Sequence, residues 1–216
     1  MRNLLSESKI LFNEAFNEEQ QKVVGKLILE AEEGEKDIFL KSIWEYDQYI
    51  GGIGGYSMPP NPIYNPYPGG EYRELFRPLQ YARSDMHHDL QYYSHHRNIV
   101  MMSGMHLEGV LRAVLKKTKT FGSLRYATIT LGKATNEIKK MNIQPPAVIN
   151  SLYAFVKLYN KSKHEVNHDE ERERLFDLSD AIVCYLAARV IRVKLLVSIE
   201  HDSVFYEYKI NDATFR

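Results

Sequence analysis

The hydrophobic positions of this chain recur mostly at the spacing of an amphipathic helix. Between residues 4 and 31, apolar side chains return every three or four residues on one broad stripe, and this pattern predicts a helical unit that ends at Gly34. A second helix is predicted over residues 36–49, with Trp44, the only tryptophan, as its anchor in the core. The N-terminal fifth of the chain is therefore expected to be helical.

The same spacing dominates the remainder of the chain. It holds from Leu79 to Lys117 and predicts either one long helix or two nearly collinear helices. Further helices are expected over residues 123–141, 147–159 and 175–199. The tail SVFYEYKI alternates enough for a short strand, although a fraying extension is equally compatible with it. Five to seven helices with almost no strand signal predict an all-α helical bundle, and residues 1–216 are expected to form a single domain.

One segment interrupts the helical pattern. The run GGIGGYSMPPNPIYNPYPGGEY, residues 51–72, holds six glycines, five prolines and four tyrosines. Proline and glycine at this density disfavour both helix and strand, so a long irregular loop insertion is predicted. Segments of this kind are surface loops or binding elements. The loop could therefore serve as a docking element for a protein partner.

Charge is balanced overall but unevenly distributed. Lysine and arginine together number 28, aspartate and glutamate also number 28, and the formal net charge is zero. This balance removes the net basic character typical of nucleic-acid-binding proteins. The stretch from Glu14 to Glu35 is nevertheless acidic, whereas the stretch from Arg112 to Lys140 is basic. One face of the protein could therefore attract an anion.

Hydrophobic content, the single cysteine and the search for targeting segments indicate the broad class of protein. A hydrophobic content of 44% over 216 residues is that of a soluble globular protein. Cys184, the single cysteine, excludes an internal disulfide and lies in an apolar run that predicts a buried side chain. Neither a signal peptide nor a membrane span is recognised, so no membrane association and a cytoplasmic location are expected.

Most familiar catalytic motifs are missing. The sequence contains no phosphate-binding GxxxxGK[ST], no HExxH and no CxxC pair. Five of the eight histidines fall between Met86 and His106, but their spacing on one helix cannot bring three imidazoles to one ion. A metal would need a ligand from another helix, such as His164 or His168. Partly buried histidines making ordinary hydrogen bonds are the simpler interpretation, so neither a metal nor another cofactor is predicted.

The stretch LYNKSKHEVNH, residues 158–168, is the clearest candidate for a catalytic site in this sequence. Metal-free cleavage of RNA needs a group to accept a proton from the 2′-hydroxyl, a group to protonate the leaving oxygen, and cations near the phosphorane. A histidine side chain ordinarily titrates near neutral pH, so His164 suits proton transfer, and Lys161 and Lys163 supply positive charge. The competing interpretation is the polar end of a helix, where such residues satisfy free carbonyls.

The order of motifs resembles the HEPN superfamily, an all-α group that includes toxins, abortive-infection proteins and RNases. The segments LEGVLRAVL, LGKATNEI and SLYAFVKLYNKSKH are followed by a long apolar helix, and the resemblance covers roughly residues 100–200. The family signature is an arginine, a polar residue and then a histidine, often appearing as RNKxxH. Asn160, Lys161 and His164 fall on matching positions, whereas Tyr159 stands where the family has arginine.

The resemblance implies a homodimer that acts on RNA in a toxin or phage-defence setting, with a metal-independent endoribonuclease site assembled at the dimer interface. The implied roles are proton transfer by His164, phosphate contacts by Lys161 and Lys163, orientation by Asn160 and support across the bundle from Glu108. Because Tyr159 cannot supply a permanent charge, the site could bind RNA without cleaving it.

The alternative is a non-enzymatic protein-interaction module that uses the tyrosine- and proline-rich loop or the histidine-rich helix. For Glu108, pairing with Arg112 one turn later on the same helix is the simpler expectation.

Overall fold

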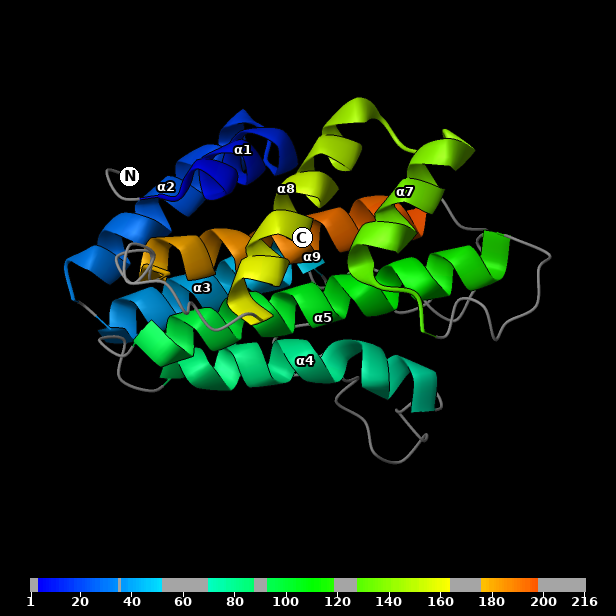
Figure 1. Cartoon of the computed structure of the whole chain (residues 1–216). Helices are drawn as coiled ribbons and strands as arrows, with labels where there is room; N and C mark the ends of the chain where they lie inside the picture. The colour runs from blue at the N-terminus through cyan, green and yellow to red at the C-terminus, as the bar shows by residue number, and fades with distance from the viewer. Residues whose placement is uncertain are drawn as a thin grey trace, which may run out of the picture.

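All the regular secondary structure in the part of the chain that the structure describes is helical (Figure 1). This computed structural model describes residues 4–34, 36–51, 70–87, 93–118, 128–163 and 176–197. Eight helices and no strand occur in these ranges: α1 (Ser6–Ala15), α2 (Glu18–Glu32), α3 (Lys36–Gly51), α4 (Gly70–His87), α5 (Tyr93–Thr118), α7 (Leu131–Met141), α8 (Pro146–Lys163) and α9 (Leu178–Val197). The all-α prediction is confirmed, and none of these helices has the length and apolarity that a membrane span requires.

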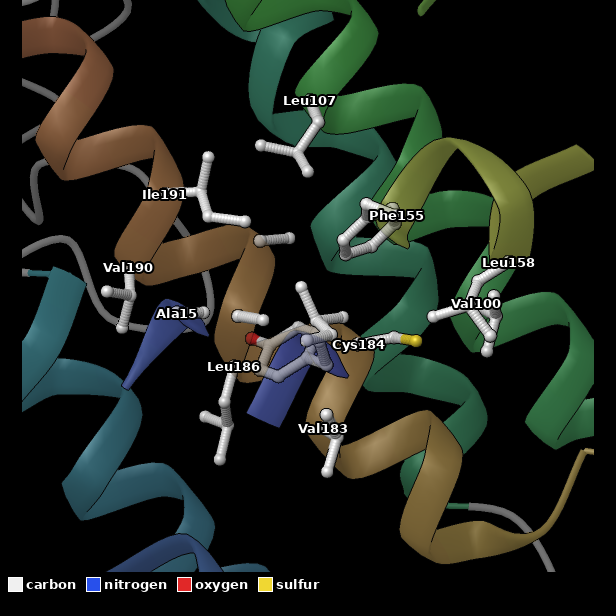
Figure 2. Close-up of a cluster of buried hydrophobic side chains, with 14 of the residues drawn as sticks. Ala15, Val100, Leu107, Phe155, Leu158, Val183, Cys184, Leu186, Val190 and Ile191 are labelled. Carbon is white, nitrogen blue, oxygen red and sulfur yellow. The ribbon is translucent and has the colours of Figure 1, made fainter. Parts of the chain in front are cut away.

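Helix α9 forms the centre of the bundle. Every residue from Ser179 to Arg192 is buried, so this part of the helix has no solvent-facing side. It contacts α1, α2 and α3 as well as α5 and α8. Figure 2 shows apolar side chains from several of these helices gathered around it, among them Ala15, Val100, Leu107, Phe155 and Leu158. The Cys184 side chain is buried in this core, as predicted.

The first predicted helical unit is in fact two helices, α1 and α2. The chain leaves the helical conformation at Phe16, and Asn17 caps α2. The Asn17 side chain accepts a hydrogen bond from the Gln20 backbone N–H at 2.8 Å, and the Gln20 side chain accepts one from the Asn17 backbone N–H at 3.1 Å. This reciprocal capping box satisfies two amides that would otherwise lack partners. Gly34, with a φ of 78°, follows the end of α2 as expected.

The prediction of one long or two collinear helices between Leu79 and Lys117 is wrong. Helices α4 and α5 run antiparallel, side by side (Figure 1). His95 of α5 lies 3.6 Å from Asp85, near the end of α4, and His106 lies 2.8 Å from the carbonyl of Leu75, near its beginning. Both helices bury one apolar stripe, so the spacing of apolar residues is the same whether the chain continues or reverses.

Several predicted boundaries also shift. Residues 128–130 precede α7 and are not helical, because Thr130 adopts an extended conformation before Leu131 begins the helix. Helix reaches into both ends of the predicted loop, since α3 ends at Gly51 and α4 begins at Gly70. The remainder of that loop and the predicted tail strand lie outside the described residues. Helix α8 begins at Pro146, where the missing N–H costs no helical hydrogen bond.

An ion pair is buried between α3 and α9. Arg189 Nε lies 2.6 Å from Asp47 Oδ1, and their side chains are 1% and 2% exposed. A cavity of about 10 Å³, close to the volume of one water molecule, borders Asp47 and Tyr185. On its outer side the Arg83 guanidinium lies 3.0 Å from the centre of the Trp44 ring. Trp44 is thus only partly buried, and it joins α3 to α4 through this cation–π contact.

The fully buried His106 predicts a pH-dependent stability. Burial lowers its pKa well below the ordinary value of 6.5, and nearby Arg192 and Arg189 lower it further, whereas the hydrogen bond to Leu75 opposes them. Below pH 6.5 the unfolded chain therefore takes up a proton that the folded protein does not. The resulting loss of unfolding free energy approaches about 1.4 kcal/mol per pH unit as the pH falls further.

Urea unfolding of the wild type and of His106→Gln, measured at intervals of about one pH unit from about pH 5 to about pH 8, checks this prediction. Below pH 6.5 the substitution is expected to remove the contribution of His106 to the slope of unfolding free energy against pH. Above pH 6.5 that slope is expected to stay unchanged. Equal slopes for the two proteins below that pH would contradict the prediction.

Candidate nucleic-acid interface at the end of helix α8

The last turns of α8 carry four of the six predicted site residues. Asn160 and Lys163 are exposed, Lys161 is partly exposed, and Tyr159 is buried. Buried Tyr159 and Ser162 lie on the inner face of the helix, and exposed Asn160 and Lys163 lie on the outer face, as its periodicity requires. His164 lies outside the described residues and follows Lys163 directly in the chain. Helix α8 therefore presents an amide and an ammonium group immediately before the predicted proton-transfer residue.

Tyr159 is held in the core by a glycine on the facing helix. Its side chain is 3% exposed, and its ring covers Gly104 of α5 so closely that a Cβ there would lie 2.9 Å from Cε2. Burial, followed by the charge of Glu108, raises the pKa of Tyr159 to about 12, and Arg112 opposes both. The phenol thus stays protonated at neutral pH. A structural role suits this position better than proton acceptance does.

The two lysines of the motif have different surroundings. Lys163 Nζ lies 3.5 Å from the centre of the Tyr159 ring and remains on the surface. Lys161 Nζ lies 3.8 Å from Glu7 Oε2 of α1. Burial tends to raise the pKa of Glu7, but hydrogen bonds and the charges of Lys161 and Lys157 outweigh this effect, and the pKa is lowered. Lys161 therefore helps to join α8 to α1, and Lys163 is the better placed of the two to contact a ligand.

Arg97 of α5 is a residue that the sequence reasoning missed. Its Nε donates a hydrogen bond of 2.7 Å to the carbonyl of Ser162, in the last turn of α8. A guanidinium at this place satisfies a terminal carbonyl and complements the negative end of the helix dipole. It also brings a planar, permanently charged group to the end of α8, beside the predicted site residues. Arg97 and Ser162 are 65 residues apart, so no local spacing could have predicted the contact.

Glu108 pairs with Arg112, as its spacing predicts, and it also joins α5 to α7. Its Oε1 accepts a hydrogen bond of 2.7 Å from Arg112 on the same helix, and its Oε2 accepts one of 2.8 Å from the backbone N–H of Leu131. Arg112 in turn donates to the carbonyl of Ile129 at 2.9 Å. Both carboxylate oxygens are therefore used to hold the start of α7 against α5. The start of α7 also lies beside Val156 of α8, since a Cβ at Gly132 would lie 3.4 Å from that side chain.

Most charged residues of α7 and α8 are lysines. Together the two helices contain six lysines and one acidic residue, Glu137, which pairs with Lys140 at 2.9 Å. Tyr153 lies between them, with its hydroxyl donating to Asn136 at 2.7 Å and Lys139 Nζ lying 5.4 Å from its ring centre. We call this the α7–α8 basic surface, and its lysines are Lys133, Lys139, Lys140, Lys157, Lys161 and Lys163.

The histidines examined as possible ligands make ordinary contacts. His96 Nδ1 donates to the carbonyl of Phe176 at 3.1 Å, and His106 Nδ1 donates to that of Leu75 at 2.8 Å. His88 and His168 lie outside the described residues. Within the described ranges, no three His, Cys, Asp or Glu side chains are grouped so that they could hold a metal ion.

Comparisons of the whole chain with protein-family models, curated proteins and solved structures found no match.

Proposed function

We propose that this protein binds RNA through its phosphate backbone at the α7–α8 basic surface, with Arg97 and the end of α8 at the centre of the interface. The observation that carries the proposal is the separation of charge. A chain with no net charge places six lysines and a single acidic residue on two adjacent helices. Clustered cations on one face are the electrostatic footprint of a nucleic-acid-binding protein.

The polar groups between these lysines favour RNA over a small anion. Asn150 and Asn160 expose amides that can donate to and accept from bases or 2′-hydroxyls, and Tyr153 offers a partly exposed ring on which a base can stack. Lysines on two helices suit a chain of phosphates better than a single one. The resemblance to HEPN domains at Asn160, Lys161 and His164 points to the same class of ligand.

The same surface supports a second, stricter proposal, metal-independent cleavage. Arg97 and Lys163 are the cations that would stabilise the charge of the phosphorane, and Asn160 would orient the phosphate. His164 would carry the proton transfer. The resemblance implies that a second copy completes such a site. Tyr159 takes no part in this scheme because its ring is buried and its pKa is raised.

Fluorescence anisotropy with a labelled single-stranded RNA in EDTA tests the binding proposal. Lys163→Ala and Arg97→Ala are each expected to weaken binding by roughly five- to tenfold, because each removes a charged phosphate contact. Lys41→Ala, which removes an exposed lysine from α3, is the matched control and is expected to leave the affinity unchanged. Circular dichroism of each variant separates lost binding from lost folding.

Gel analysis of the same reactions tests cleavage. RNA that is cut by the wild type but remains intact with His164→Ala supports the nuclease proposal. Cleavage that His164→Ala leaves unchanged, or intact RNA throughout, contradicts it without affecting the binding proposal. Equal affinity of Lys163→Ala, Arg97→Ala and wild type for RNA would contradict the binding proposal itself.

A further inference from the structure

A groove between α2 and α3 forms a second candidate binding surface. It encloses about 490 Å³, which is within the usual range for ligand pockets. Leu27 and Tyr46 are buried at its base, and Val23 is 38% exposed beside them. Two packed antiparallel helices with an apolar seam offer the kind of groove in which a third helix can lie.

The sides of this groove are acidic. Glu19 and Glu30 line it from α2, and Glu45 lines it from α3. Lys26 is the one basic residue among the lining residues, and its Nζ lies 3.5 Å from Glu30 Oε1. Three carboxylates and one ammonium leave an excess of two negative charges around an apolar base. A helix that combines lysines with an apolar residue would complement the groove in both respects.

Helix α7 of this chain has that character. Its buried face holds Leu131, Ala134 and Ile138, which leaves Lys133 and Lys140 exposed on the other side. Lys133 and Lys140 are about 10 Å apart along the helix axis, close enough to reach carboxylates on the two walls of one groove. Just beyond the helix, Ile143 is 39% exposed. The exposed side of α7 therefore carries lysines and then an apolar side chain.

We propose that the α2–α3 groove binds helix α7 of a second copy of this chain. The two surfaces carry opposite charge on a chain whose net charge is zero, and α2 and α7 lie on opposite sides of α8 (Figure 1). Two different surfaces that meet in this way form a head-to-tail contact, which leads to rings or longer assemblies. The contact uses Lys133 and Lys140, which also belong to the α7–α8 basic surface, but it needs neither Arg97 nor the end of α8, so association can be tested without RNA.

Sedimentation velocity at low and at high salt tests the proposal with charge-reversal variants. The wild type is expected to associate at about 10 mM ionic strength and to dissociate at about 1 M, because salt screens exposed charges. Reversing the groove (Glu19→Lys with Glu45→Lys) or the helix (Lys133→Glu with Lys140→Glu) is expected to weaken association by roughly tenfold or more. A chain carrying all four substitutions regains opposite charges at the contact, so its association is expected to recover.

A matched control separates the contact from the effect of net charge. Glu32→Lys with Glu33→Lys adds the same positive charge at two exposed positions that do not line the groove, and it is expected to associate like the wild type. A monomeric wild type at low salt would overturn the proposal. The proposal would also be overturned if the chain with all four substitutions did not regain association, which would point to a different partner for the groove. Equal weakening of association by the control pair would overturn it as well.

Discussion

Gly104→Ala is expected to lower the free energy of unfolding by about 2–3 kcal/mol, even though alanine is the better helix former. The added Cβ would lie 2.5 Å from Cγ of Tyr159 and 2.9 Å from Cε2, distances at which one of the two helices must move. The ring cannot move aside easily, because it is buried beneath Lys163. Urea unfolding followed by circular dichroism measures the change.

Gly25→Ala in α2 provides a control of opposite sign. No atom lies within 4 Å of a Cβ at Gly25, so this substitution is expected to stabilise the protein by up to about 1 kcal/mol. A second check is the combination of Gly104→Ala with Tyr159→Ala, which removes Cγ and the ring. Since the clash involves these atoms, Gly104→Ala is expected to cost less when alanine replaces Tyr159. An equal cost in both backgrounds would show that Tyr159 is not the residue that requires a glycine at position 104.

Asp47→Asn is expected to lower the free energy of unfolding by about 3–5 kcal/mol, the largest effect expected in this protein. The substitution leaves the guanidinium of Arg189 without its carboxylate, at a side chain that is 1% exposed. Arg192, which is also buried, lies one turn further along α9. A buried cation deprived of its carboxylate is far more destabilising than the same loss at the surface.

Two controls separate burial from ion pairing in general. Lys26→Ala breaks the pair with Glu30, where the lysine side chain is 76% exposed, and is expected to cost less than about 0.5 kcal/mol. Replacing both buried partners, Asp47→Leu with Arg189→Met, is expected to recover most of the stability that Asp47→Asn loses. A loss below about 1 kcal/mol for Asp47→Asn would contradict the importance assigned to this pair.

The sequence predicts the helices better than their arrangement. Apolar periodicity located the helical regions because it records which face of each helix is buried. It does not record direction, so it predicts one long helix or two collinear helices where α4 and α5 form an antiparallel pair. The break at Asn17 had a local signal, the capping box with Gln20, whereas the buried partnership of Asp47 with Arg189 joins residues 142 positions apart and had none.

In the candidate site, too, the sequence predicts local features but not the contacts between distant helices. Helical spacing located the end of α8 and the pairing of Glu108 with Arg112, both of which are local. The contact of Arg97 with α8 and the burial of Tyr159 against Gly104 depend on how α5 packs on α8. The sequence therefore suggested which residues could bind a phosphate. It could not indicate that an arginine from another helix stands beside them.

The salt dependence of RNA binding tests the central claim, that phosphates bind at the α7–α8 basic surface. For single-stranded RNA, each phosphate contact contributes about 0.7 to the slope of log affinity against log salt concentration. We expect a steep negative slope for the wild type, a slope shallower by about 0.7 for Lys163→Ala, and an unchanged slope for Lys41→Ala. An affinity for RNA that does not respond to salt, or that Lys41→Ala and Lys163→Ala reduce equally, would contradict the claim.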